Sequence, residues 1–296
     1  MEIRTDLAVE SRIIEESHDA LPNGIRLQRQ SRHGIPTTVV ELKTRSASEA
    51  VGKPKGTYIT VELGSVLRRE KESFEGAVRT IAEYLQELLS LPGSLPVLVA
   101  GLGNREVTPD AVGPLTADHI LVTRHMLKKM PREFGHFRPV GAVVPGVLGT
   151  TGMESAETVR ALTEKTEAAA VIAIDAIAAR DTDKLCSTVQ LSNTGITPGS
   201  GIGNTRCALD QSTLGVPVIA IGVPTVTDAA TMAADLFERA GLTADEQRLR
   251  QVSTGMIVTS SDIDRRVREI SRVLAYGINA ALQPHLELQD LTDLTF

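Results

Sequence analysis

The feature that most constrains this chain is its alternation of short apolar runs with amphipathic stretches after residue 95. The apolar runs occupy 96–102, 140–144, 168–174, 186–191 and 216–222. Helical periodicity marks 112–129, 154–166, 226–240 and 261–283. Continuous apolar runs are typical of strands buried on both faces, and strand–helix alternation is typical of a parallel sheet covered by helices. We therefore expect an α/β protein with a mostly parallel sheet and helices on both sides.

The first part of the chain is more polar but carries recognisable elements. Clusters of β-branched residues predict strands over 38–42 and 58–63. Apolar side chains recur at helical spacing over 74–89, which predicts a helix with Ser73 as its N-cap. Because no repeat, low-complexity segment or linker interrupts the pattern, a single domain is the simpler interpretation.

Composition and charge exclude several classes of partner. The 31 Lys and Arg residues are outnumbered by 37 Asp and Glu, aromatic residues are 3% and Trp is absent, which disfavours nucleic-acid binding. No run approaches the roughly 18 apolar residues of a membrane helix, and the first residues do not resemble a signal peptide. Two cysteines, Cys186 and Cys207, fit a reducing compartment. We expect a cytoplasmic protein that binds neither nucleic acid nor membrane.

Glycine-rich turns follow two of the expected strands. Gly101 and Gly103 come after the first apolar run, but Glu106 occupies the position of the third glycine in a dinucleotide-binding fingerprint. The stretch 199–203 lacks the Lys-Ser/Thr of a phosphate-binding P-loop. Tight turns that allow close backbone packing are the favoured interpretation. Nucleotide or phosphate binding stays an alternative.

Motifs for nucleophilic or metal-dependent chemistry are weak. The sequence has no Gly-x-Ser-x-Gly elbow, and neither cysteine has a His nearby in sequence. His119 and His125 are six residues apart, which places them on different faces of a helix. No His-Glu-x-x-His or Cys-x-x-Cys pair occurs. We therefore predict no metal and no cofactor.

Two aspartates stand where the expected strands end. Asp175 interrupts an apolar stretch, and a charge there is unfavourable unless it is paired or protonated. Asp110 follows the strand over 96–102, and either residue could instead cap a helix. Ligands bind beyond the carboxyl ends of parallel strands, so the two carboxyl groups could share one site. One would activate water as a base and the other would stay protonated as an acid, which suggests hydrolysis.

At these residues the chain resembles the germination proteases of spore-forming bacteria, which are spore endopeptidases of the atypical aspartic type. The matching pieces run in order along nearly the whole chain: RTDLAVE at 4–10, GLGN at 101–104, VTPDAVGP at 107–114, LVTRH at 121–125, PGV at 145–147 with TGME at 151–154, IDAIAAR at 174–180, and NTGI at 193–196 with GN at 203–204.

The resemblance implies a fold, an activity and an assembly. Such proteases are three-layer α/β/α sandwiches related to hydrogenase-maturation endopeptidases, and they form homotetramers. They degrade the α/β-type small acid-soluble proteins of dormant spores during germination, so the location implied is the forespore or spore core. The two family aspartates fall on Asp110 and Asp175. Substrate-site loops would include Gly103, Asn104, Gly201 and Asn204.

The resemblance also implies a zymogen that trims itself. The junction falls at Asp6–Leu7, which would divide the chain into a pro-segment at 1–6 and a single peptidase domain at 7–296. Only six residues precede Leu7, fewer than such proteases typically carry.

Burial makes Asp175 the candidate for the raised pKa, while Asp110, with Asn104 and Arg105 close in sequence, should ionise more easily. A mechanism with one catalytic carboxylate and one orienting it, and a metal-dependent maturation endopeptidase of the same fold, stay open.

Overall fold

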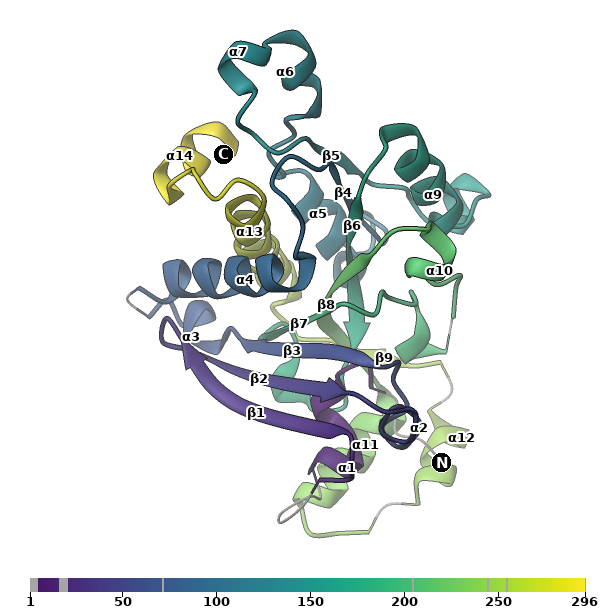
Figure 1. Ribbon diagram of the computed structural model, residues 1–296. Coiled ribbons are helices and arrows are strands. Elements are labelled where there is room, and N and C mark those ends of the chain that lie inside the picture. Colours follow the sequence, from purple (N-terminus) through teal and green to yellow (C-terminus); the bar gives the residue numbers. More distant parts are fainter. Residues whose placement is uncertain are drawn as a thin grey trace.

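A mixed sheet forms the centre of the molecule. The computed structural model describes residues 5–15, 21–70, 72–203, 205–243, 245–253 and 255–295. Within these ranges nine strands join one sheet in the order β1-β2-β3-β7-β8-β6-β4-β5, with β9 paired to β8 (Figure 1). The strands are β1 Ile25–Arg32, β2 Ile35–Leu42, β3 Gly56–Glu62, β4 Val97–Gly101, β5 Val140–Val143, β6 Ala170–Ala178, β7 Thr188–Ser192, β8 Val218–Asp228 and β9 Ile257–Val258.

The expectation of a mostly parallel sheet is correct only for one half. Strands β5, β4, β6 and β8 run parallel to one another, whereas β1, β2, β3, β7 and β9 join by antiparallel pairing. The antiparallel half begins with a two-residue turn at His33 and Gly34, both with positive φ, which is the geometry of a tight hairpin. A hairpin this short cannot hold a crossover helix, so the strands it joins must be antiparallel.

The chain forms fourteen helices and four short 3₁₀ turns within the described ranges. The helices are α1 Arg12–Glu15, α2 Arg45–Val51, α3 Gly64–Leu67, α4 Ser73–Leu89, α5 Val112–Ala117, α6 Arg124–Lys129, α7 Pro131–Phe134, α8 Leu148–Thr151, α9 Ser155–Thr166, α10 Gln211–Leu214, α11 Ala229–Arg239, α12 Glu246–Val252, α13 Ile263–Leu282 and α14 Leu288–Thr295. The 3₁₀ turns are η1 Ala8–Glu10, η2 Thr108–Asp110, η3 Thr182–Lys184 and η4 Ser200–Ile202. None of these helices is long and apolar enough to cross a membrane.

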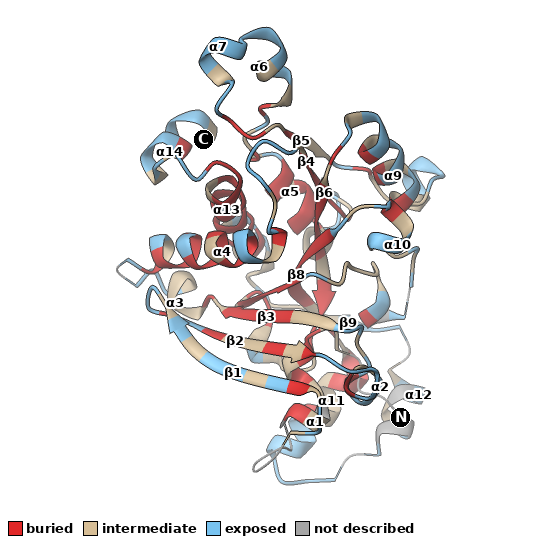
Figure 2. Ribbon diagram, in the orientation of Figure 1, coloured by how far each residue is buried: buried red, intermediate tan, exposed pale blue. Residues whose placement is uncertain are grey.

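Helices cover both faces of the parallel half of the sheet, which gives three layers (Figure 1). Helices α4, α5 and α13 lie on one face, and α9 and α10 lie on the other. Along β6 the side chains alternate between the two cores: Ile172 and Ile174 pack with the first group of helices, Val171 and Ala173 with the second. Strands β4, β6 and β8 are buried throughout most of their length (Figure 2).

Two local predictions are wrong. Ser73 is the first residue of α4 rather than its N-cap, and its hydroxyl donates to the carbonyl of Glu70 at 2.6 Å. The helix expected over 112–129 is divided into α5 and α6, because Thr123 leaves the helix to bind the start of β5. Its hydroxyl oxygen accepts the N–H of Val140 at 2.9 Å.

Candidate active site

The two aspartates come from neighbouring parallel strands. Asp175 lies inside β6, where it pairs with Gly222 of β8, and Asp110 closes η2 in the loop after β4. The strands are joined at this level by a hydrogen bond from Leu102 N to the carbonyl of Ile174, 2.8 Å long. The sheet therefore brings both carboxyl groups to the same cavity, as the sequence pattern predicted. Neither carboxylate caps a helix, so the alternative of helix N-caps is wrong.

A sharp loop holds Asp110 in place. The backbone N–H of Asn104 donates to Asp110 Oδ2 at 2.7 Å. Gly103 has φ +110°, and a Cβ there would lie 2.1 Å from the carbonyl oxygen of Asp110. Only glycine fits this conformation and this approach, so Gly103 fixes the path of the loop around the carboxylate. Arg105 does not face Asp110, because its guanidinium binds Asp118 with two hydrogen bonds.

The environments of the two carboxyl groups differ. Asp175 is 4% exposed, and burial raises its pKa well above the ordinary value, with the charges of Asp110 and Asp6 adding to the increase. Burial also raises the pKa of Asp110, which is less enclosed, and the N–H of Asn104 opposes that increase. Since the two groups interact, they titrate as a pair. Burial therefore favours the protonated form more strongly at Asp175 than at Asp110.

The cavity around the pair has a volume of about 640 Å³ and a largely apolar wall. Its apolar lining comes from loops and strand ends: Leu102, Val107, Pro109, Val147, Leu148, Ile177, Val226 and Ile257. Val107 and Ile257 are exposed, so the apolar surface continues to the rim. An open apolar cavity with a few convergent polar groups is typical of a site for an organic ligand or a polypeptide segment.

Asp6 brings a third carboxylate to the cavity. Its Oδ2 accepts the N–H of Ala178 at 2.9 Å, and its Oδ1 accepts the hydroxyl of Ser200 at 2.8 Å. A Cβ on Gly201 would lie 2.2 Å from Asp6 Oδ2, so only glycine allows this approach. The next residue, Leu7, is 1% exposed among Ile177, Ala179 and Leu185. Asp6 thus lies in the same cavity as Asp110 and Asp175, and Leu7 is buried beside it.

The structure gathers most of the predicted loop residues and adds others. Gly103, Asn104 and Gly201 line the cavity, and Asn204 lies outside the described residues. Glu154, Arg206 and Cys207 also line it. Glu154 lies within one of the resembling motifs, but nothing in the residue pattern around Arg206 or Cys207 marks a site.

The glycines after β4 serve packing. A Cβ on Gly101 would lie 2.2 Å from the carbonyl oxygen of Gly113 in α5, and Gly103 packs against Asp110. These contacts support the tight-turn interpretation of the segment. In the part of the chain that the structure describes, no group of three or more His, Cys, Asp or Glu side chains is placed to hold a metal ion.

Fold and cavity define an α/β protein in which two carboxyl groups line one cavity, Asp175 from within β6 and Asp110 from the loop after β4. A family model described as germination protease matches residues 2–240. The germination protease of Clostridium acetobutylicum is 39% identical, with 98% of each chain covered, and that of Priestia megaterium is 33% identical, with 97% of this chain and 95% of its own covered. The chain belongs to the germination protease family, and it is a peptidase, a hydrolase of peptide bonds.

A solved structure gives a weaker comparison. A [NiFe] hydrogenase maturation protease from Thermococcus kodakarensis aligns with 66% of this chain and 98% of its own, at 16% identity and a TM-score of 0.34. These values are too low to support an argument from that protein.

Proposed function

We propose that this peptidase is an endopeptidase that starts the degradation of α/β-type small acid-soluble spore proteins when a spore germinates. Its location would be the cytoplasm of the forespore and the spore core. Membership of the germination protease family supports this substrate and this setting. The observation that carries the catalytic part is the buried Asp175 beside the less enclosed Asp110 at one cavity.

The proposed mechanism uses the two carboxyl groups as base and acid. Ionised Asp110 accepts a proton from a water molecule as the water oxygen attacks the peptide carbonyl carbon. Protonated Asp175 donates to the carbonyl oxygen of the substrate. The proton taken up by Asp110 then passes to the leaving nitrogen as the C–N bond breaks, and the proton on the former carbonyl oxygen returns to Asp175, so both groups regain their starting states. The different environments of the two groups, one buried and one less enclosed, support this division of roles. A mechanism in which Asp110 alone reacts and Asp175 orients it would keep the same geometry.

We also propose that the chain is a zymogen that cleaves its own Asp6–Leu7 bond. The division into a pro-segment at 1–6 and a peptidase domain at 7–296 follows from that cleavage. The position of Asp6 in the cavity of the paired aspartates supports it. Incubation of the full chain should release Leu7 as a new amino terminus by mass spectrometry, and Asp175→Asn should stay intact. If the parent chain stays uncut under conditions in which it digests substrate, self-processing is contradicted but the proposed peptidase activity is not.

A cleavage assay tests the function. The chain beginning at Leu7 is incubated with a purified α/β-type small acid-soluble spore protein, with and without EDTA. The proposal predicts cleavage at internal bonds that EDTA does not prevent. Cleavage abolished by EDTA would instead indicate a metal-dependent maturation endopeptidase. No cleavage, together with thermal stabilisation by a nucleotide, would indicate a nucleotide- or phosphate-binding protein.

A further inference from the structure

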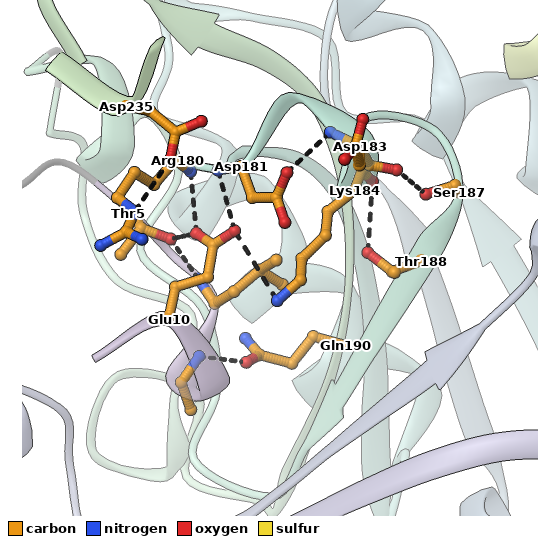
Figure 3. A network of polar contacts seen from close by, with 12 residues as sticks. Thr5, Glu10, Arg180, Asp181, Asp183, Lys184, Ser187, Thr188, Gln190 and Asp235 are labelled. Carbon is orange, nitrogen blue, oxygen red and sulfur yellow. Dashed lines mark hydrogen bonds and ion pairs between the residues drawn. The ribbon is translucent and has the colours of Figure 1, made fainter. Parts of the chain in front are cut away.

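Glu10 is a buried carboxylate at the end of the N-terminal segment. Its side chain is 0% exposed. Glu10 Oε2 accepts the N–H of Arg180 at 2.8 Å, Oε1 accepts the N–H of Asp181 at 3.1 Å, and Lys184 Nζ lies 4.0 Å from Oε1 (Figure 3). A carboxylate excluded from water is unfavourable unless charged partners and hydrogen bonds compensate it. The one ammonium in this set is at the limit of an ion-pair distance, so the site has capacity for another cation.

The hydroxyl of Thr5 stands between Glu10 and the backbone nitrogen of Leu7. It donates a short hydrogen bond to Glu10 Oε2 and accepts the N–H of Leu7 at 3.1 Å. The turn that follows is fixed by a hydrogen bond from Glu10 N to the carbonyl of Leu7, 3.2 Å long, and by one from Ala8 N to Gln190 Oε1, 2.7 Å long. The nitrogen of Leu7 is therefore held one hydroxyl group away from a buried carboxylate.

We propose that Glu10 is the binding site for the α-ammonium group that cleavage of the Asp6–Leu7 bond creates. The inference rests on the cleavage proposed above. Hydrolysis adds the water oxygen to the carbonyl carbon of Asp6, which becomes a carboxylate, and leaves the Leu7 nitrogen as an amine that takes up a proton. Once Thr5 is removed, this ammonium takes the place of the Thr5 hydroxyl and pairs directly with Glu10. The hydrogen bond from a neutral hydroxyl is thereby replaced by one from a charged donor.

Charges on the surrounding elements favour a cation at this point. The acidic groups near Glu10 are Glu62 on β3, Asp181 before η3, Asp183 within η3 and Asp235 on α11. The basic groups are Lys184, Arg180, Arg239 on α11 and Lys53. Arg239 and Arg180 pair with Asp235, and Arg239 also binds Asp181 and Asp183. Lys184 lies near both Glu10 and Glu62, and Lys53 donates to the carbonyl of Thr5 at 3.4 Å. A second ammonium would relieve this surplus of negative charge.

The new pair would hold the segment that follows Asp175. In the uncut chain Asp6 binds Ala178 through its side chain and through its backbone N–H, which donates to the carbonyl of Ala178 at 2.9 Å. Cleavage would allow the peptide that ends at Asp6 to leave, and its hydrogen bonds to Ala178 would then be lost. Glu10 still holds the N–H groups of Arg180 and Asp181, and the ammonium of Leu7 fixes Glu10. We therefore assign Glu10 as a positioning residue that couples removal of the pro-segment to the loop beside the active site.

The test starts from a chain whose free Leu7 amino group is made by an unrelated protease acting on an N-terminal fusion. Self-cleavage is then not needed, and its failure would be seen separately as an uncut full-length chain. The rate of reductive methylation of the Leu7 amine is measured by mass spectrometry in the folded chain and in urea. Pairing with Glu10 should slow the reaction at least about tenfold, since raising the pKa of the amine from about 8 to about 9 lowers the reactive fraction tenfold.

Glu10→Gln separates ion pairing from simple burial of Leu7. This variant keeps an oxygen acceptor but no charge, and it should restore most of the reaction rate. Glu62→Gln removes a neighbouring carboxylate that no hydrogen bond joins to Leu7, and it should leave the protection in place. Protection that survives in Glu10→Gln, or an amine that reacts as fast in the folded parent as in urea, overturns the proposal.

A chain with one glycine added before Leu7 provides a test that needs no substitution at Glu10. The extra residue displaces the ammonium by one Cα spacing, about 3.8 Å, so the amine should react as fast as in urea. Activity on substrate should fall relative to the chain that begins at Leu7. If the extended chain keeps both the slow reaction and full activity, the pairing is not what positions the segment.

Discussion

At the scale of single residues, the site is built on one unfavourable placement. Asp175 is buried in a strand whose other inward side chains are apolar, and burial raises its pKa well above the ordinary value. Gly103 and Gly201 make room for two further carboxylates of the cavity, Asp110 and Asp6 respectively. Exclusion of water from Asp175 thus favours the protonated form of its carboxyl group.

The pH dependence of stability should show this placement. The pKa of Asp175 is raised in the folded state, so the unfolded chain ionises first, above about pH 3.9. Stability is therefore lost as pH rises from there to the folded pKa. Asp175→Asn should unfold at higher urea concentration than the parent at pH 7 and should lose that advantage near about pH 3.5. The gain is about 1.4 kcal/mol for every tenfold difference between the acid dissociation constants of the folded and unfolded states.

Asp210 provides a control, because its pKa is shifted in the opposite direction to that of Asp175. The pKa of Asp210 is lowered, first by the hydroxyl of Ser212, so its contribution is present at neutral pH and is lost on acidification. Asp210→Asn should therefore be less stable than the parent at pH 7, and this difference should shrink in acid, which is the opposite sign to Asp175→Asn. Equal pH profiles for the parent and Asp175→Asn would show that this carboxyl group is not desolvated in solution.

Gly103→Ala should separate loop geometry from folding. The added methyl group meets the carbonyl oxygen of Asp110 at 2.1 Å and φ is +110°, so the loop must shift. We expect at least a tenfold loss of peptidase activity and about 1–3 kcal/mol of stability. Gly93→Ala is the matched control, because nothing lies within 4 Å of its Cβ and its φ is ordinary. Full activity in Gly103→Ala would show that the path of this loop does not matter for catalysis.

At the scale of elements, apolar runs predicted strands well and their directions poorly. The runs over 96–102, 168–174 and 216–222 became β4, β6 and β8, because a strand buried on both faces leaves a continuous apolar signal. Strand direction depends on which strands become neighbours, and a run of residues does not encode that. The split between α5 and α6 was also hidden, since it depends on Thr123 reaching the start of β5.

Two hydrogen bonds between the start of β5 and the end of α13 should contribute stability without affecting catalysis. Arg138, just before β5, donates its N–H to Gln283 Oε1 at 3.0 Å, and its carbonyl accepts Gln283 Nε2 at 3.0 Å; both residues are buried. Gln283→Ala leaves the buried N–H of Arg138 unpaired, while the carbonyl of Arg138 keeps the hydroxyl of Thr123, and the substitution should lower the free energy of unfolding by about 1–3 kcal/mol. Activity per folded molecule should not change. Gln289→Ala, at an exposed position on α14, should change stability little. Equal effects of the two variants would show that the hydrogen bonds between Arg138 and Gln283 do not contribute stability.

At the scale of the whole molecule, the sequence predicted that Asp110 and Asp175 share a cavity but did not predict all of its lining. The sequence alone predicts that Asp110 and Asp175 can share a site, because parallel strands end at one edge of a sheet. The place of Asp6 in the same cavity could not, since it comes from the opposite end of the chain. The cavity-lining Arg206 and Cys207 were missed for the same reason: their loop has no pattern that places it beside β4 and β6.

The assembly is a separate prediction. The family resemblance implies a homotetramer, and sedimentation equilibrium of the chain beginning at Leu7 should give four times the mass of one chain. Asp175→Asn should give the same mass, because its carboxyl group lies inside the subunit. A stable monomer that cleaves substrate at the parent rate would contradict the need for a tetramer.

Peptide hydrolysis by this chain should depend on the pair of aspartates, Asp110 and Asp175. The most direct measurement is the initial rate of cleavage of an α/β-type small acid-soluble spore protein by the parent, Asp110→Asn, Asp175→Asn and the control Asp228→Asn, which changes a helix N-cap. We expect both site variants to lose cleavage while keeping the folded state, and Asp228→Asn to retain it. Full activity in a folded Asp110→Asn or Asp175→Asn variant would contradict the claim.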